Sequence, residues 1–123
     1  MKRTIAFDLD DVICTRNSNE GKVEKYYTCS PVKSMVEVVN NCYNDGNIVI
    51  IYTARGMTGF NGNVSKIYSN LYDLTLKQLN DWGVKYHQLV MGKLHYDLLI
   101  DDKAINSLGI DENDIENFFK EQR

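Results

Sequence analysis

The stretch TIAFDLDDVIC, residues 4–14, determines how the rest of the sequence is interpreted. It begins as an apolar run that is typical of a buried strand, and it continues into three acidic residues, Asp8, Asp10 and Asp11. Like charges this close repel one another, so the end of a buried strand is an unfavourable place for them unless a cation offsets the repulsion. The pattern therefore predicts a strand over residues 3–9 with functional groups at its carboxyl end.

Three further strands and three helices are expected around this first strand. β-Branched and apolar residues run together, as in strands covered on both faces, over residues 47–54, 85–91 and 97–101. Apolar residues recur at helical spacing over residues 31–45, 64–82 and 111–122. Strands that alternate with helices form parallel sheets. The sequence therefore predicts a single α/β domain over residues 1–123, with a three-layer Rossmann-like fold in which helices cover both faces of a parallel sheet.

Length, composition and charge exclude several classes of protein. A chain of 123 residues, 43% hydrophobic and 25% charged, suits one globular domain with one core. The net charge of −3 argues against a broad nucleic-acid surface, and no apolar run approaches the roughly 18 residues that span a bilayer. The chain begins without a signal-peptide pattern, and its cysteines, Cys14, Cys29 and Cys42, show no CxxC spacing. We therefore expect a cytoplasmic protein with reduced thiols.

The ends of three predicted strands carry groups that bind metals or phosphate. Asp8 and Asp10 lie at the end of the first strand, and Thr53 lies at the end of the second. The fourth strand runs into Asp101 and Asp102. Ligands bind beyond the carboxyl ends of parallel strands, so these groups meet at one place if the first strand lies between the other two. Carboxylates gathered there need a divalent cation, and hard oxygen ligands favour Mg²⁺.

Lys93 adds a positive charge to the same end of the predicted sheet, because it lies in the loop before the fourth strand. A cation, the Thr53 hydroxyl, free backbone N–H groups and a metal together make a phosphate site. In such a site Asp8 can attack phosphorus as a nucleophile. Asp10 can protonate the leaving oxygen and then deprotonate water. The residues therefore favour phosphoryl chemistry through an aspartyl-phosphate.

Four motifs occur in a defined order along the chain: FDLDDV, IIYTAR, GK and LLIDDKA. The set resembles the signature motifs of the haloacid dehalogenase-like (HAD) superfamily of hydrolases. A narrower likeness over residues 4–107 rests on FDLDDVIC, YTARGM and MGKLHYDLLIDDKAIN, which resemble short HAD proteins described as capsular-polysaccharide biosynthesis phosphatases. The resemblance implies a HAD-like core, a Mg²⁺-dependent phosphatase activity and a role in polysaccharide biosynthesis.

The resemblance also implies a role for each matched residue. Asp8 is the nucleophile and a metal ligand, and Asp10 is the acid/base that also offers its backbone carbonyl to Mg²⁺. Thr53, with Ala54 beside it, holds the phosphoryl group, and Lys93 neutralises the nucleophile and the phosphate.

The paired acids Asp101 and Asp102 complete the implied metal site. Asp102 matches the usual direct ligand and Asp101 matches a partner behind it, and the reverse assignment stays open. Asp11 stands where the family often has Gly, so we expect it at the periphery of the site.

Both places where HAD phosphatases carry a cap domain are short in this chain. Residues 11–30 and 85–96 leave no room for a folded cap, so the resemblance implies a capless, open site. Such a site suits a large substrate, or a small one shielded by a neighbouring copy in a homo-oligomer. Arg55 is expected either to bind a second phosphate or an acidic sugar group, or to form a structural ion pair. The loop 56–63 is expected to be either a mobile flap or a plain connection.

Three functions are compatible with these residues. The first is a Mg²⁺-dependent phosphomonoester hydrolase that acts on a small phosphorylated metabolite, in particular a sugar phosphate. The acidic pI of about 5.3 favours this function. The alternatives are a phosphatase for nucleotides or polynucleotide ends and a catalytically silent HAD-fold binding module. A dehalogenase fits less well, because dehalogenases typically lack the second acid of the pair that Asp8 and Asp10 form.

Overall fold

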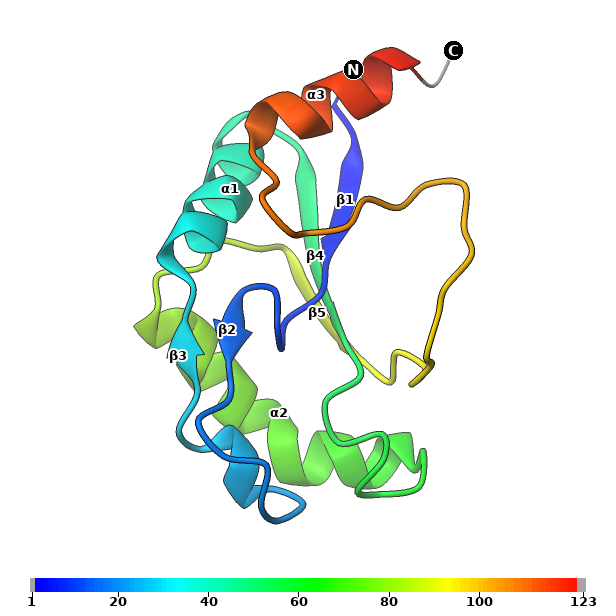
Figure 1. The fold of residues 1–123 in the computed structure, drawn as a ribbon. Helices are drawn as coiled ribbons and strands as arrows, with labels where there is room; N and C mark the ends of the chain where they lie inside the picture. Colours follow the sequence, from blue (N-terminus) through cyan, green and yellow to red (C-terminus); the bar gives the residue numbers. More distant parts are fainter. Residues whose placement is uncertain (1, 122–123) are drawn as a thin grey trace.

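The computed structural model describes residues 2–121 and has a small parallel sheet at its centre (Figure 1). The sheet has the strand order β1-β4-β5, with β1 at Thr4–Phe7, β4 at Ile48–Thr53 and β5 at Gln88–Met91. Both neighbouring pairs are parallel, and Thr53 at the end of β4 lies opposite Met91 at the end of β5. The carboxyl ends of the strands therefore share one edge of the molecule.

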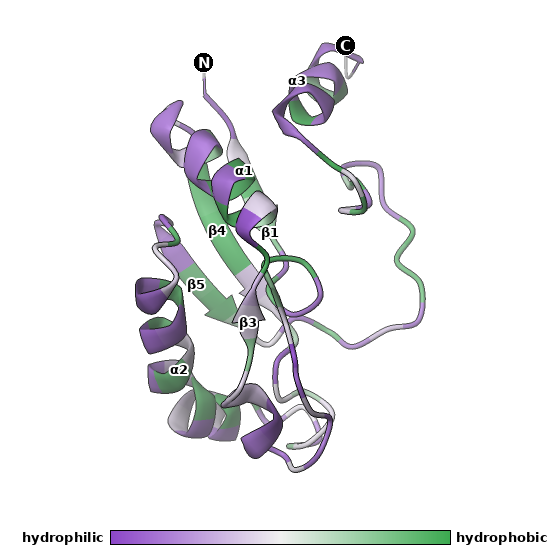
Figure 2. Ribbon diagram, turned by 60° about the vertical axis from the view of Figure 1, so that its left-hand side comes forward, coloured by the Kyte–Doolittle hydropathy of each residue, from purple (hydrophilic) through white to green (hydrophobic). Residues whose placement is uncertain are grey.

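β4 is the central strand because its residues suit burial. Its sequence IVIIYT is dominated by β-branched and apolar side chains. Val49 and Ile51 are fully buried, and β4 is green over most of its length in Figure 2. β1 lies at the edge of the sheet. The arrangement considered from the sequence, in which the first strand lies between the other two, is therefore not the one observed.

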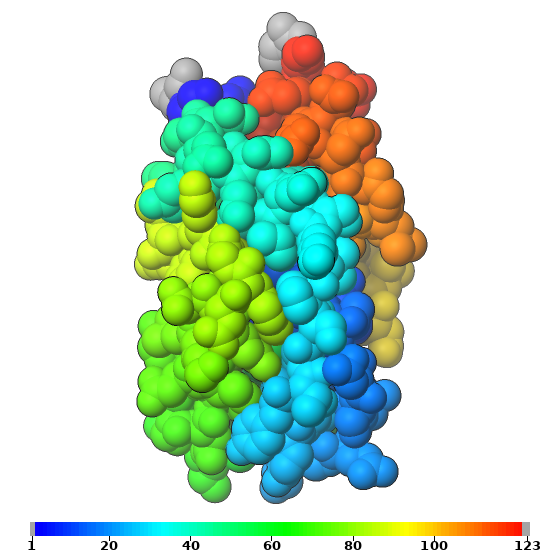
Figure 3. Space-filling model, turned by 90° about the vertical axis from the view of Figure 1, so that its left-hand side faces the viewer, coloured from blue at the N-terminus to red at the C-terminus, as the bar shows by residue number. Residues whose placement is uncertain are grey.

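The helices α1 (Lys33–Asn44) and α2 (Val64–Asp81) are the crossovers between successive parallel strands. Both crossovers run in the same direction along the sheet, and right-handed connections then place both helices on one face. Figure 3 views this face, with α1 in cyan and α2 in green. The expected α/β class with a parallel sheet is confirmed, but two layers are clear where three were expected. No helix within residues 2–121 is long and apolar enough to cross a membrane.

The third helix, α3 (Glu112–Glu121), packs near the start of the strands. It contacts α1 and buries Ile115. The Arg3 guanidinium lies 4.4 Å from the centre of the Phe119 ring. The predicted tail helix is thus confirmed for its described part, although α3 contributes nothing to the far end of the sheet.

A short insert between β1 and α1 forms its own antiparallel pair, β2 (Cys14–Thr15) with β3 (Ser30–Pro31), and a 3₁₀ turn, η1 (Glu24–Tyr26). The pairing of Pro31 opposite Cys14 explains why α1 begins at Lys33 and not at Pro31 as expected. Val32 between them is extended, and its N–H donates to the Ile13 carbonyl at 2.7 Å. The insert is therefore anchored to the end of β1, although it is too short for a cap domain.

The strand predicted over residues 97–101 is not formed. The segment 92–111 contains no helix or strand, and it leaves the body of the protein as a long loop (Figure 1). Leu98 and Ile100 are 76% and 89% exposed. The apolar run DLLID has strand propensity, but a strand exists only when its backbone pairs with a neighbour. Here no residue of the segment joins the ladder of β1, whose outer edge has no strand beside it in the described chain.

Candidate functional site

A cleft of about 520 Å³ lies at the carboxyl end of the sheet. Each of the three strands delivers residues to it: Asp8 and Asp10 come just after β1, Thr53 ends β4, and Lys93 follows β5. Ala54 and Arg55 continue from β4 into its wall. The structure therefore brings together six of the residues that the sequence singled out.

Asp8 and Lys93 form an ion pair at the mouth of the cleft. The Lys93 ammonium donates to Asp8 Oδ2 at 3.2 Å, and the Leu9 N–H donates to Asp8 Oδ1 at 2.8 Å. The Asp8 side chain is 37% exposed, so a ligand can reach it. Burial alone would lower the pKa of Lys93, but the charge of Asp8 and the side-chain hydrogen bonds of Tyr96 and Asp8 together outweigh this effect and raise the pKa. Lys93 is therefore held as a cation directly beside the candidate nucleophile.

Backbone pairing fixes the position of Lys93 relative to Thr53. The Lys93 N–H donates to the Thr53 carbonyl at 3.1 Å, which extends the parallel ladder of β4 and β5 by one bond. The Thr53 side chain is buried, and its hydroxyl accepts from the Arg55 N–H at 3.0 Å. Within residues 2–121 this hydroxyl donates to no other group, so its hydrogen is available for the predicted contact with a phosphoryl oxygen.

Arg55 is the most buried charged residue of the site, with its side chain 0% exposed. It makes a two-pronged ion pair with Asp10: Nε donates to Oδ2 at 3.1 Å and Nη2 donates to Oδ1 at 2.9 Å. Burial alone would lower the pKa of Arg55, but the hydrogen bonds and charge of Asp10 raise it instead. Bidentate pairs of this kind are strong and geometrically specific. Arg55 therefore fixes the orientation of the Asp10 carboxylate.

The remaining Arg55 donors are directed at helix α2. Nη1 donates to Thr75 Oγ1 at 3.1 Å and to Gln78 Oε1 at 2.6 Å. The guanidinium also lies 4.7 Å from the centre of the Tyr26 ring, within the range of a cation–π contact. Of the two uses expected for Arg55, the structural ion pair is the one observed. Its donors are taken by the protein and not left free for a second anion of a ligand.

Gly56 allows the chain to turn at this point. Its φ is +83°, and a Cβ there would lie 2.7 Å from Leu71 Cδ1. The Gly56 N–H donates to the Tyr26 hydroxyl at 3.0 Å. A side chain at residue 56 would therefore be strained by the positive φ and would displace the buried Leu71 side chain. The sequence did contain a signal for this network, because Thr75 and Gln78 are polar residues three positions apart on the buried side of α2.

The Asp10–Arg55 pair restricts what Asp10 can do in this arrangement. Both carboxylate oxygens accept from Arg55, and Oδ1 also accepts from Cys14 Sγ, so the second lone pair of Oδ2 is the position left for a proton. The predicted acid step therefore uses this lone pair of Oδ2 or requires Asp10 to release one of these bonds. The predicted base step needs no proton on Asp10 beforehand.

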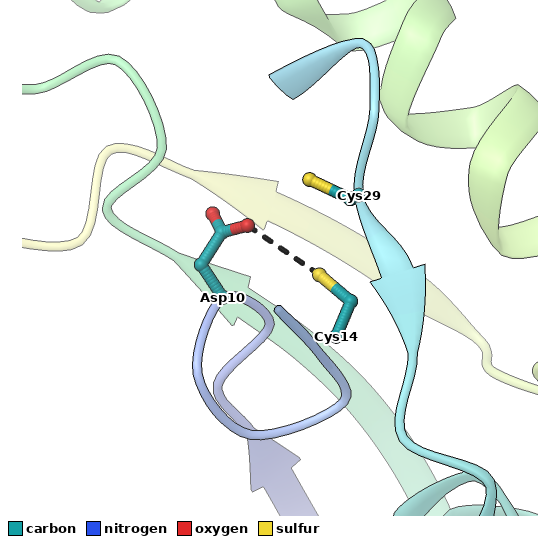
Figure 4. Close-up of side chains that lie close together, drawn as sticks. All are labelled: Asp10, Cys14 and Cys29. Carbon is teal, nitrogen blue, oxygen red and sulfur yellow. Dashed lines mark hydrogen bonds between the residues drawn. The ribbon is translucent and has the colours of Figure 1, made fainter. Parts of the chain in front are cut away.

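Two thiols complete the surroundings of Asp10 (Figure 4). Cys14 Sγ donates to Asp10 Oδ1 at 3.4 Å, and the ligand atoms of Asp10, Cys14 and Cys29 all lie within 4.8 Å of one another. Arg55 Nη2 is 3.7 Å from both sulfur atoms. Burial raises the pKa of both thiols, and thiolates, not thiols, are good metal ligands. A fixed guanidinium among neutral thiols disfavours a cation, so this cluster belongs to the packing around Arg55.

The structure does not bring Asp101 and Asp102 to the cleft. Both are exposed, and neither lines the cleft. Hydrogen bonds from nearby backbone N–H groups, first that of Lys103, lower the pKa of Asp101. The reason for their position is the unpaired segment 92–111, because the expected convergence depended on a strand beside β1.

The donor set of the cleft fits a hard cation in part. Asp8 presents a carboxylate to the open cleft, and Asp10, whose backbone carbonyl the resemblance assigns to the ion, lines the same cleft. Oxygen ligands of this type suit Mg²⁺, which keeps several waters and binds through one or two carboxylates. Asp8 and Asp10 would therefore hold the ion, and Asp101 and Asp102 do not belong to the set in this arrangement.

The chain matches no known protein-family profile and no curated protein significantly. Its fold is similar to the crystal structure of an MCSG target from Vibrio cholerae, with a TM-score of 0.82 and 25% sequence identity over 100% of both chains. The description of that protein names no activity. The similarity therefore supports the small α/β architecture and leaves the chemistry of the cleft to be argued from its residues.

Proposed function

We propose that the protein is a Mg²⁺-dependent phosphomonoester hydrolase that works through an aspartyl-phosphate. The observation that carries the proposal is the Asp8 carboxylate, which is open to the cleft, hydrogen-bonded by Lys93 at 3.2 Å, and close in the fold to the Thr53 hydroxyl. A nucleophile, a fixed cation and a buried hydroxyl donor at adjacent strand ends are the parts that phosphoryl transfer needs. The resemblance to the HAD motifs points to the same chemistry.

Each residue then has a defined part in the reaction. An Asp8 oxygen attacks phosphorus, the bond from phosphorus to the leaving oxygen breaks, and the phosphoryl group is carried on Asp8. Lys93 stabilises the negative charge on the phosphoryl oxygens, and the Thr53 hydroxyl donates to one of them. Asp10, in its protonated form, gives its proton to the leaving oxygen and becomes a carboxylate. It then takes a proton from the water that attacks phosphorus and releases phosphate from Asp8.

The metal would be held by Asp8 and the backbone carbonyl of Asp10, and it would add positive charge beside the phosphate. Asp102, with Asp101 behind it or in the reverse order, joins this set only if the segment 97–102 moves toward β1. Two features favour such a movement: within residues 2–121 no strand pairs with the outer edge of β1, and Leu98 and Ile100 lie in solvent. Pairing would satisfy the strand edge and bury these side chains.

The cleft also bears on the size of the substrate. A volume of about 520 Å³ lies within the range of pockets for small molecules. We therefore propose a small phosphorylated metabolite as the substrate, with sugar phosphates as the first class to test.

The test is the release of p-nitrophenol from p-nitrophenyl phosphate by the native chain and by Asp8→Asn, with Mg²⁺ and with EDTA. Asn keeps the size of the side chain but is a much weaker nucleophile, so turnover should fall by about 10³-fold or more. EDTA should abolish the native activity. Unfolding curves of the two proteins should stay similar, since Asp8 is partly exposed. Turnover that survives in Asp8→Asn would exclude Asp8 as the nucleophile, and Mg²⁺ binding without turnover of any phosphomonoester would favour a silent binding module.

A further inference from the structure

Arg16 belongs to the insert between β1 and α1 and lines one side of the cleft, which we call the insert wall. One hydrogen-bond donor of its side chain is buried and has no partner in the described chain. Its Nε is shielded from solvent and makes no hydrogen bond to any residue of the described chain. The nearest carboxylate to its guanidinium is Asp11, at 3.8 Å from Nη2, which is beyond hydrogen-bonding distance. The Asp11 side chain is itself 73% exposed. Buried polar groups without partners are rare in folded proteins, so this donor needs an explanation.

Lys25 lies on the same wall and lines the same cleft. Its ammonium lies 5.3 Å from the centre of the Tyr26 ring, and the Arg16 guanidinium lies 5.9 Å from the same centre. No carboxylate of residues 2–121 forms an ion pair with Lys25. Two cations, those of Arg16 and Lys25, therefore lie near the buried Tyr26 ring, and neither makes a close ion pair with a carboxylate of residues 2–121.

The charges that line the cleft are distributed unevenly. Asp8 is paired with Lys93, and Asp10 is paired with Arg55, so both of these carboxylates are neutralised within the site. Among the described residues that line the cleft, Asp11 is the one remaining carboxylate, and it lies 3.8 Å from Arg16 Nη2. The excess of positive charge lies on the insert wall, away from the Asp8–Lys93 pair that would handle the scissile phosphate.

We propose that Arg16 and Lys25 form a second anion subsite, and that the substrate is a phosphomonoester that carries a further phosphate or carboxylate. The inference rests on the proposed function for the position of the scissile group. The Arg16 side chain is 27% exposed and lines the cleft, so an anion bound there can accept from its guanidinium while Lys25 contributes charge. A rotation of the guanidinium toward that anion would also give the buried Nε donor a partner. The structure thus gives the role once expected of Arg55 to two residues of the insert.

The experiment compares pairs of ligands that differ by one anion. Calorimetric titrations use the Asp8→Asn protein, which binds without turnover, in one Mg²⁺ buffer. Fructose 6-phosphate against fructose 1,6-bisphosphate tests a second phosphate, and glycerol 3-phosphate against 3-phosphoglycerate tests a carboxylate. We expect at least one doubly anionic ligand to bind about tenfold more tightly than its partner, because one charge-assisted hydrogen bond is worth that much. Which pair shows the preference identifies the second anion.

Substitutions on the insert wall then locate the preference. Arg16→Gln, made in the same Asp8→Asn protein, should reduce it to about twofold or less, and Arg16→Lys should retain part of it. Lys25→Gln should weaken it partly. Lys33→Gln is the matched control, because Lys33 is exposed and lies outside the cleft, so it should change nothing. Chelation of Mg²⁺ by the ligands is the same for all variants and cancels in this comparison.

The results separate this inference from the proposed function. Equal affinity within both pairs, binding of neither member, or a preference that Arg16→Gln leaves intact would overturn the subsite. An Arg16-dependent preference together with a native chain that hydrolyses no phosphomonoester would keep the subsite and overturn the hydrolase. Thermal unfolding of each variant identifies losses that come from misfolding.

Discussion

The Asp10–Arg55 pair and the segment 97–102 are opposite extremes of one proposed site. Arg55 is fully buried, and its donors reach Asp10, Thr75 and Gln78. Asp101 and Asp102 lie on an exposed loop without regular structure. One half of the site is thus fixed by packing before any ligand arrives, and the other half has no packed partner. The difference shows that a side chain near the end of a strand is held in place only when the strand itself is paired with a neighbouring strand.

The largest effect is expected for Arg55→Met, which removes the cation from the packed half of the site. The change leaves the Asp10 carboxylate without its partner at a side-chain exposure of only 10%. Loss of one member of a buried pair typically costs about 3–5 kcal/mol, and we expect the free energy of unfolding in urea to fall by that amount. Adding Asp10→Leu should recover part of the loss, because the unpaired carboxylate is removed.

The matched control for Arg55→Met is Lys77→Met, which removes the exposed pair between Lys77 and Asp81 on α2. Exposed pairs of this spacing contribute about 0.3–0.5 kcal/mol. Equal losses for the two variants would show that the buried pair has no special role in stability.

A second experiment compares apolar side chains in the two regions. Leu71→Ala, in the core beside Gly56, should lower the free energy of unfolding by about 2–5 kcal/mol, because it leaves a cavity. Leu98→Ala should change it by less than about 0.5 kcal/mol, because the Leu98 side chain is 76% exposed. A large loss for Leu98→Ala would mean that the segment is packed in solution. Repeating the Leu98 measurement with Mg²⁺ tests whether the ion draws the segment toward β1.

The smallest effect is expected for a substitution of Lys93, which pairs with Asp8 and lies at the start of the segment 92–111. Its pKa is raised in the folded protein, so the interactions of its ammonium with Asp8 and Tyr96 contribute stability that is fully present below the pKa of an unfolded lysine, about 10.4. This contribution is lost as the pH rises through the higher folded value. The difference in unfolding free energy between the native chain and Lys93→Met should therefore be constant from pH 7 to pH 9 and should shrink above about pH 10.5. A difference that grows at high pH would contradict the assignment.

The sequence was sufficient for the elements whose signal is local. The apolar runs at the start of the chain and at residues 47–54 became β1 and β4, and the helical spacing after Asn63 became α2. Asn63 caps this helix by accepting the Lys66 N–H at 3.1 Å. The strand ends then place Asp8, Thr53 and Lys93 together without further information, because parallel strands share one edge.

The sequence was not sufficient where a residue's role depends on a distant partner. Residues 97–101 have the composition of a strand, but pairing is a property of two segments and not of one. For Arg55 both a ligand contact and an ion pair were open, and the positions of Asp10 and of α2 together decide between them. The sequence did not predict a role for Arg16, because a buried donor without a partner can be recognised only in three dimensions.

The Arg55 network has a consequence for how this protein can change in evolution. It ties together Asp10, Arg55 and the α2 pair Thr75 and Gln78, which come from three separate parts of the chain. A lineage that lost Asp10 would keep a buried guanidinium with no counter-charge, and one that lost Arg55 would keep a buried carboxylate with none. Either change is harmful alone and tolerable only with the other. We therefore expect these four positions to be inherited as a block, so that related chains keep all of them or replace all of them.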